Sequence, residues 1–127
     1  MLIPRMVLWL SASVFALFGC LFTARPQAMA RVVEIELPTA TAMVDFAATY
    51  GGFELGFAVF LAICTREDEW VRPGLLASAC ALGGFAVVRA AGILAPGGAV
   101  NALMYPVLAL EIGGAALSVW AFRRARH

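Results

Sequence analysis

The stretch "VDFAATYGGFELGFAVFLAIC", residues 44–64, decides the fold of this chain. It is long and apolar enough to cross a lipid bilayer, which takes about 20 mostly apolar residues. Near its middle stands a carboxylate, Glu54, with two glycines just before it. An ionisable group inside a membrane span is costly unless it is paired or reached by water. The rest of the sequence must therefore supply a partner, a proton or a ligand for Glu54.

The composition of the whole chain also indicates that lipid is its solvent. Of the 127 residues, 63% are hydrophobic and 13% are charged, whereas soluble domains are about 45–50% apolar and about 25% charged. The net charge is +1, so no basic surface argues for nucleic acid as a partner. Cys20, Cys64 and Cys80 form no C-x-x-C pair. We expect them to be small packing residues, with no disulfide, metal site or cofactor.

Four apolar segments are long enough to span a membrane. They cover residues 6–24, 42–64, 73–94 and 102–122. A charged break, TREDEWVRPG (65–74), and a glycine-rich turn, APGGAVN (95–101), separate the last three. We therefore predict an all-α fold, in which a single integral membrane four-helix bundle occupies residues 1–127.

The N-terminal segment allows two interpretations. Residues 1–30 fit a cleaved secretory signal that ends in the small-residue motif AMA (28–30). The apolar run is longer than the usual signal core of about 7–15 residues. We favour a retained first span, and cleavage would leave three spans in the same orientation.

Arginine positions predict the orientation, because cytoplasmic loops are enriched in Lys and Arg. One side of the membrane would hold Arg5, Arg66, Arg72, Arg123, Arg124 and Arg126, and the other side Arg25 and Arg31. We therefore expect a multi-pass protein of the bacterial inner membrane with both termini in the cytoplasm. Segment 25–41 would face the opposite side. Its alternation of Val33, Ile35 and Leu37 with glutamates predicts a short strand or an extended piece on the membrane surface.

Three ionisable residues lie deep within the predicted spans. At about 1.5 Å per residue, Glu54 and Glu111 both lie roughly 15 Å from a membrane surface, near the midplane. Arg89 lies nearer the outer surface, but helical side chains lean toward the N-terminus, which directs Arg89 toward the same depth. We therefore predict a buried cluster of these three groups. The cluster would be either a structural ion network that fixes helix order or a ligand or proton site.

Asp45, near the start of the second span, is about half a turn out of phase with Glu54 on a regular helix. We expect it to face elsewhere unless the helix bends at the paired glycines. Small residues allow close helix packing in lipid. On this basis we predict helix–helix contacts at Gly51, Gly52, Gly56 and Gly114.

The motif YGG-x-E-L-G contains Tyr50, Gly51, Gly52, Glu54 and Gly56. With Arg89 late in the third span and Glu111 in the fourth, it resembles a family of small bacterial four-helix membrane proteins catalogued as a domain of unknown function. The resemblance covers nearly the whole chain. It implies the four-span fold and adds Tyr50 and Asp45 to the ligand or proton site, but it supplies no activity.

In that family a basic residue often stands between the positions of Asp45 and Tyr50, and here FAAT (46–49) has none. A second intramembrane positive charge is therefore not expected. The chain is also more loosely similar to four-helix membrane proteins of the DoxX type, some of which are subunits of oxidoreductase complexes. That likeness is an analogy of architecture.

Three classes of function fit these features unequally. A non-enzymatic membrane protein, either an accessory subunit or a small ligand-binding bundle, needs the charged groups and the packing faces alone. A proton-coupled transporter of small molecules or cations would use Glu54 and Glu111. An enzyme fits least, because the single histidine is the terminal His127 and no Ser–His or Cys pair is present. The expected partners are membrane lipids and either a larger membrane complex or further copies of the chain.

Overall fold

The computed structural model describes residues 1–97 and 99–125, and over this part of the chain it is helical without strands. In chain order the elements are α1 (Leu2–Ala24), α2 (Pro26–Val32), α3 (Ala40–Phe46), the π-helical segment η1 (Ala47–Gly52), α4 (Phe53–Cys64), α5 (Asp68–Leu94) and α6 (Met104–Arg124). Helix α3 continues through η1 into α4 as one helix, Ala40–Cys64. This helix, α1, α5 and α6 are each long and apolar enough to cross a membrane. The predicted all-α fold with four spans is confirmed.

The third span begins earlier than its apolar composition predicts. Helix α5 starts at Asp68, with Asp68 and Glu69 in its first turn, and Pro73 lies inside the helix. Acidic residues in a first turn favour helix formation because they face the positive end of the helix dipole. Pro73 lies in the second turn of α5, where it has no N–H group to donate to the carbonyl oxygen of Glu69.

Segment 25–41 begins with helix α2, which was not predicted, and residues 33–38 form a turn and an irregular stretch instead of a strand. Pro26 is the first residue of α2, where its fixed backbone angle suits a helix start. After α2 the chain turns back at Glu34, whose φ of 58° is uncommon for a residue other than glycine. Val33 and Leu37 then pack against a small cluster formed by Phe22, Ala30 and Phe46. Two of the three alternating residues thus pack onto this cluster, whereas Ile35 is 37% exposed.

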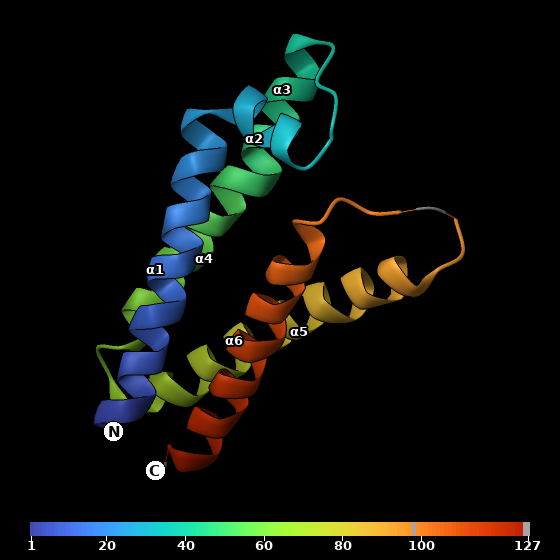
Figure 1. Ribbon diagram of the computed structural model, residues 1–127. Helices are drawn as coiled ribbons and strands as arrows, with labels where there is room; N and C mark the ends of the chain where they lie inside the picture. Colours follow the sequence, from blue (N-terminus) through green and yellow to red (C-terminus); the bar gives the residue numbers. More distant parts are fainter. Residues whose placement is uncertain (98, 126–127) are drawn as a thin grey trace.

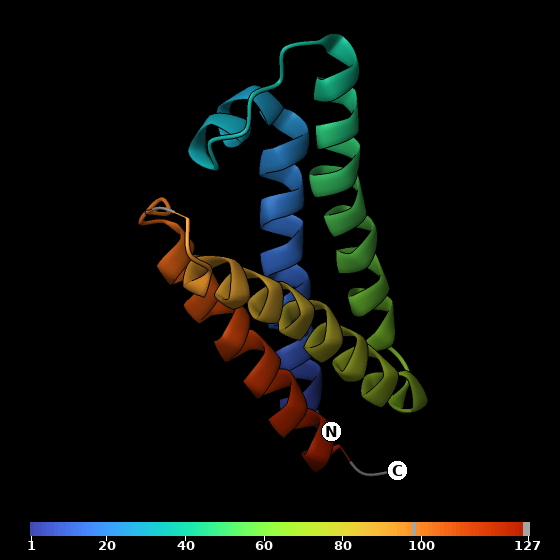
Figure 2. The same cartoon turned by 90° about the vertical axis from the view of Figure 1, so that its right-hand side faces the viewer.

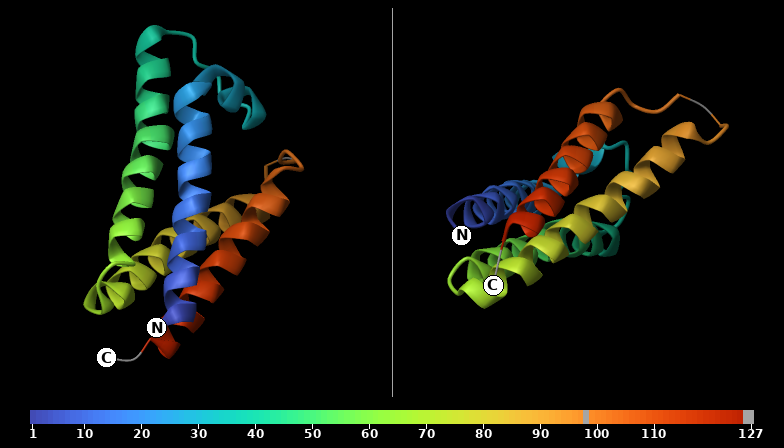
Figure 3. Two further views of the ribbon diagram at one scale, coloured as in Figure 1. Left: turned by 90° about the vertical axis from the view of Figure 1, so that its left-hand side faces the viewer. Right: turned by 90° about the horizontal axis from the view of Figure 1, so that it is seen from below.

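Consecutive spans pair into two limbs (Figure 1). In the first limb α1 packs along η1 and α4, and in the second limb α5 packs along α6. Figures 2 and 3 show that the limbs meet where the N-terminus and the end of α6 lie, and that they diverge toward the other end. We call these the closed end and the diverging end.

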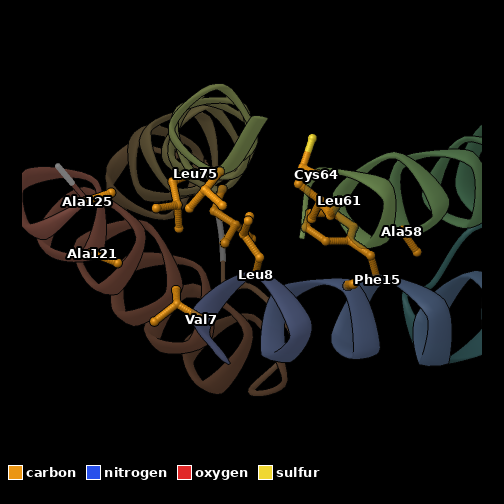
Figure 4. Close-up of a cluster of buried hydrophobic side chains, with 12 residues drawn as sticks. Val7, Leu8, Phe15, Ala58, Leu61, Cys64, Leu75, Ala121 and Ala125 are labelled. Carbon is orange, nitrogen blue, oxygen red and sulfur yellow. The ribbon is translucent and has the colours of Figure 1, made fainter. Parts of the chain in front are cut away.

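The limbs are joined at the closed end by an apolar core that all four spans share (Figure 4). Leu8 of α1, Leu61 and Cys64 of α4, and Leu75 of α5 are fully buried there. Ala121 of α6 completes the same cluster. This core lies near one end of the bundle, and the limbs diverge toward the other end (Figure 1).

Candidate functional site

Arg89 and Glu111 form an ion pair within the second limb. Arg89 Nη2 donates to Glu111 Oε1 at 2.7 Å, and Arg89 Nε donates to Oε2 at 2.9 Å. The Glu111 residue is 5% exposed. This two-point geometry is the strong form of an arginine–carboxylate contact. The two charges therefore cancel each other between α5 and α6.

Arg89 keeps one group outside this pair. Its Nη1 reaches the Sδ atom of Met104 at 3.3 Å, and a thioether sulfur is a weak acceptor. The contact comes from the first residue of α6. The guanidinium group therefore contacts two residues of α6, Glu111 and Met104.

Glu54 does not join this pair. Its Oε2 atom is buried and has no hydrogen-bond partner within the described part of the chain, and no ion pair links it to Arg89 there. The predicted cluster of three groups needs this correction. The physical reason is the pairing of the spans: Arg89 and Glu111 lie on neighbouring helices of one limb, whereas Glu54 lies on α4 of the other limb, which diverges from it (Figure 1).

Glu54 lies where one face of the second span leaves the core. Leu61 is fully buried and Ala58 is 5% exposed, whereas Glu54 is half-buried and Tyr50 is 41% exposed. These residues follow one another at spacings of three and four, so they share a helical face. Burial falls along these four positions, but Phe46, one turn beyond Tyr50, is again buried at 5% exposure. Along the chain, Glu54 therefore lies between the central core and the smaller cluster of Phe22, Ala30 and Phe46.

Two groups of aromatic rings flank Glu54 along the chain. On the diverging side, the ring of Tyr50 lies 4.7 Å from that of Phe46 and 5.6 Å from that of Phe22. On the other side, the Phe57 ring meets Phe15 of α1 edge-on at 4.8 Å. Phe53 and Phe60 stack beside Phe57 at 6.1 Å and 6.0 Å.

These aromatic groups were not part of the sequence-based prediction. Their signal is the recurrence of aromatic residues at intervals of three or four along the second span, at positions 46, 50, 53, 57 and 60. Such spacing places side chains within reach of one another on a helix. By this spacing, Tyr50 and Phe57 share a helical face with Glu54.

The π-helical turn before Glu54 holds Tyr50, Gly51 and Gly52. Such turns are rare and occur frequently at functional sites. Gly51 is buried against Thr23 of α1, and a Cβ atom added at Gly51 would collide with Thr23 Oγ1 and lie 2.9 Å from Thr23 N. The backbones of α1 and the second span thus approach closely at this turn.

The other predicted packing glycines differ among themselves. A Cβ atom at Gly114 would lie 2.7 Å from Leu82 Cδ1, so Gly114 faces α5. At Gly52 and Gly56 an added Cβ atom meets nothing within 4 Å. Predicted contacts at these two glycines are wrong within the chain, because α1 covers the face that carries Gly51, and Gly52 and Gly56 are exposed.

Asp45 is exposed and lies apart from the ion pair. It lines a groove of about 450 Å³ together with Ala40, Thr41, Val44 and Ala48. Of the cysteines, Cys64 is buried while Cys20 and Cys80 are exposed. Arg126 and His127, which entered the arguments on orientation and catalysis, lie outside the described residues, as does Gly98.

A buried cluster of three serines, which sequence reasoning missed, joins the two limbs. The Oγ atom of Ser78 on α5 lies 3.2 Å from that of Ser11 on α1 and 3.1 Å from that of Ser118 on α6. Ser78 and Ser118 are fully buried and Ser11 is 9% exposed. Hydroxyl groups commonly bridge helices in lipid. The signal in the sequence is weak, because single serines within apolar spans are ordinary.

At the diverging end a single asparagine side chain links the limbs. Asn101, in the α5–α6 loop, donates from Nδ2 to Glu34 Oε1 at 3.0 Å and to the carbonyl oxygen of Val32 at 3.4 Å. Its own Oδ1 accepts a hydrogen bond from the backbone N–H of Leu103. The end of α2 and the loop before α6 are thus held together.

No curated protein and no solved structure matches the chain. The domain of unknown function named DUF4345 matches residues 3–122. That range contains all four spans, Glu54 with its aromatic neighbours, and the Arg89–Glu111 pair. The chain therefore belongs to the DUF4345 family of domains of unknown function.

Proposed function

We propose that this protein is a non-enzymatic, multi-pass protein of the bacterial inner membrane that binds a small ligand at Glu54. The observation that carries the proposal is the buried Oε2 atom of Glu54, which has no hydrogen-bond partner in the described chain. A buried polar atom without a partner is costly, and an ionised one in hydrocarbon more so. Glu54 therefore gains a proton, a ligand or a group from another molecule.

In this proposal the Arg89–Glu111 ion pair is structural and does not bind the ligand. Because Arg89 and Glu111 neutralise each other, the second limb presents no net charge at their position. The pair would hold α5 and α6 in register, while Tyr50 would border the ligand beside Glu54. Asp45 would lie outside the site, since it is exposed on the groove near the start of α3.

For the orientation we propose that both termini are cytoplasmic, as the distribution of arginines favours. The first span would be retained, which is supported by the contribution of Leu8 on α1 to the central core. A reporter enzyme that is active only in the periplasm, fused after His127, should be silent. A strong periplasmic signal from this fusion would reverse the orientation.

A proton-coupled transporter of small molecules or cations is the second candidate. The same unpartnered carboxyl favours it, because a group that alternately binds a proton and a substrate is what such a carrier needs. Transport adds one requirement, which is that Glu54 be reached from both sides of the membrane in turn.

The proposed function is tested by identifying what the protein retains. The full chain would be purified in mild detergent and examined by native mass spectrometry, alongside Glu54→Gln and the control Glu36→Gln, which alters an exposed glutamate between the first two spans. A small molecule held by the unaltered chain and the control, but lost from Glu54→Gln, supports the proposal. Proton-driven uptake of that molecule into proteoliposomes would favour the transporter. If the protein purifies in a stoichiometric complex with another protein, and Glu54→Gln retains that complex, the result would favour an accessory-subunit role over ligand binding.

A further inference from the structure

We infer that the ligand at Glu54 is an amphiphilic organic cation, an ammonium group that carries an apolar chain. This inference rests on the proposed function and names the chemical class of its ligand. It starts from the charges of the described residues. Arg89 gives its Nε and Nη2 donors to Glu111, so Glu54 faces the ligand as an acceptor whose counter-charge must come from outside the chain.

The aromatic rings select an organic cation over an inorganic one. Tyr50 and Phe57 lie about one helical turn to either side of Glu54, spacings that bring side chains together on one face. Aromatic faces attract ammonium groups, most strongly where water is excluded. A calcium or magnesium ion would instead need about six or more oxygen ligands, and Glu54 offers a single carboxylate among rings and aliphatic side chains.

These rings are held in place before any ligand arrives. The rings of Phe22 and Phe46 lie 5.6 Å and 4.7 Å from the ring of Tyr50. Phe15, Phe53 and Phe60 surround the ring of Phe57. A site whose side chains are already ordered loses less entropy on binding. The arrangement therefore favours a ligand that the rings contact directly.

The size of the ligand follows from the link at the diverging end. Asn101 ties the α5–α6 loop to Glu34 and to the carbonyl group of Val32. A helix from a partner protein is about 10–12 Å across, so its insertion between the limbs would strain this link. A slender amphiphile could reach Glu54 from the hydrocarbon while the Asn101 link stays unbroken. Its apolar chain would remain in the lipid, so no free energy is lost in moving it.

Binding of such a cation exchanges it for a proton. We expect the Glu54 carboxyl to hold a proton when no ligand is bound, because an isolated charge inside a membrane span is costly. When the ammonium group binds, the carboxyl loses its proton to solvent and the ion pair forms. Apparent affinity should therefore fall about tenfold for each unit that the pH is lowered, as expected when one proton competes with the ligand.

Dodecyltrimethylammonium is the probe, because its quaternary head has no proton of its own to release. It would be added to the full chain in dodecyl maltoside, a detergent with the same chain length and a neutral head, which makes the head group the variable. Binding would be measured by calorimetry, and released protons by an indicator dye in weak buffer. We expect about one proton per bound cation, no such binding by Glu54→Gln, and unchanged binding by Glu36→Gln.

Substitution of the rings provides a second measurement if Glu54→Gln does not fold. Tyr50→Leu and Phe57→Leu keep an apolar side chain but remove the π face, and each should weaken binding about two- to fivefold. Equal binding by the unaltered chain and Glu54→Gln, or binding without proton release, would overturn the inference. If mass spectrometry finds a neutral or anionic molecule that depends on Glu54, the ligand class is wrong and the proposed function stands. If neither experiment depends on Glu54, both fail.

Discussion

Each limb carries one glutamate inside a membrane span, and the two have opposite surroundings. Glu111 is 5% exposed and is held by Arg89 at 2.7 Å. Glu54 is half-buried, and its buried oxygen has no partner in the described chain. The comparison shows that the predicted depth of a carboxylate in the membrane does not decide whether it has a partner. What decides it is whether the adjacent helix in the same limb supplies an arginine.

Removal of Arg89 should have the largest effect on stability. Arg89→Ala leaves Glu111 buried without its counter-charge, and such a loss costs about 3–5 kcal/mol in the free energy of unfolding. Unfolding of the purified chain in mixed micelles, monitored by circular dichroism, would measure the change. Arg66→Ala, which alters an exposed arginine, is the control and should have little effect.

A double variant separates the loss of charge from the loss of packing. Arg89→Met combined with Glu111→Leu replaces the pair by apolar side chains, and it should recover most of the stability lost in Arg89→Ala. If the double variant is as unstable as Arg89→Ala, the contact with Met104 and the surrounding packing matter more than the charges.

The glycines of the first limb should show the next largest effect. Gly51→Ala adds a methyl group that collides with the backbone and side chain of Thr23. It should cost about 1–3 kcal/mol, as overpacking usually does. Gly52→Ala adds the same group where nothing lies within 4 Å, so its unfolding curve should match that of the unaltered chain. Equal effects at both positions would mean that Gly52 also meets a helix, which could then only belong to another molecule.

The serine cluster tests how strongly the two limbs are joined. Ser78→Ala removes the central hydroxyl and should cost about 1 kcal/mol, within the range measured for hydrogen bonds between membrane helices. Ser11 and Ser118 can then donate to the carbonyl groups of their own helices, which limits the loss. Ser13→Ala is a matched control, because Ser13 is exposed and bonds within α1. If Ser78→Ala and Ser13→Ala lose a similar amount of unfolding free energy, the serine cluster does not stabilise the contact between the limbs.

The smallest effect on stability is expected at Glu54. Glu54→Gln breaks no hydrogen bond in the described chain, so we expect a change within about 0.5 kcal/mol. Combined with Glu111→Gln, the two effects should add to within about 0.3–0.5 kcal/mol, as they do for separate sites. Clear non-additivity would show that the limbs close and bring Glu54 to the ion pair.

The fold was predictable because its main determinant, the length and apolarity of each span, is local. The confirmed spans differ from the prediction at their ends, as α5 shows. Its early start at Asp68 depends on charge at a helix terminus, which hydropathy does not register. The helix α2 and the turn at Glu34 depend on packing against Phe22 and Phe46, which lie on separate spans.

The candidate site was less predictable, because it depends on which helices become neighbours. Depth and side-chain direction predicted one common level for Glu54, Arg89 and Glu111, but they carry no information on lateral distance. Gly52 and Gly51 show the same limit. They are adjacent in sequence, and the rotation about the helix axis from one residue to the next decides that Gly51 faces α1 and Gly52 does not.

The pairing of consecutive spans has a consequence for how the protein is made. Each limb is a helical hairpin whose two long segments are neighbours in the chain, so the first can insert and close while the second is still being synthesised. Glu54 then enters the bilayer ahead of Arg89, whereas Glu111 enters after it. During biogenesis the lone carboxyl must cross into the membrane in its neutral form. The glutamate of the second hairpin, Glu111, is inserted after its partner Arg89 and can form the ion pair at once. Insertion of Glu54 therefore depends on protonation, whereas insertion of Glu111 does not.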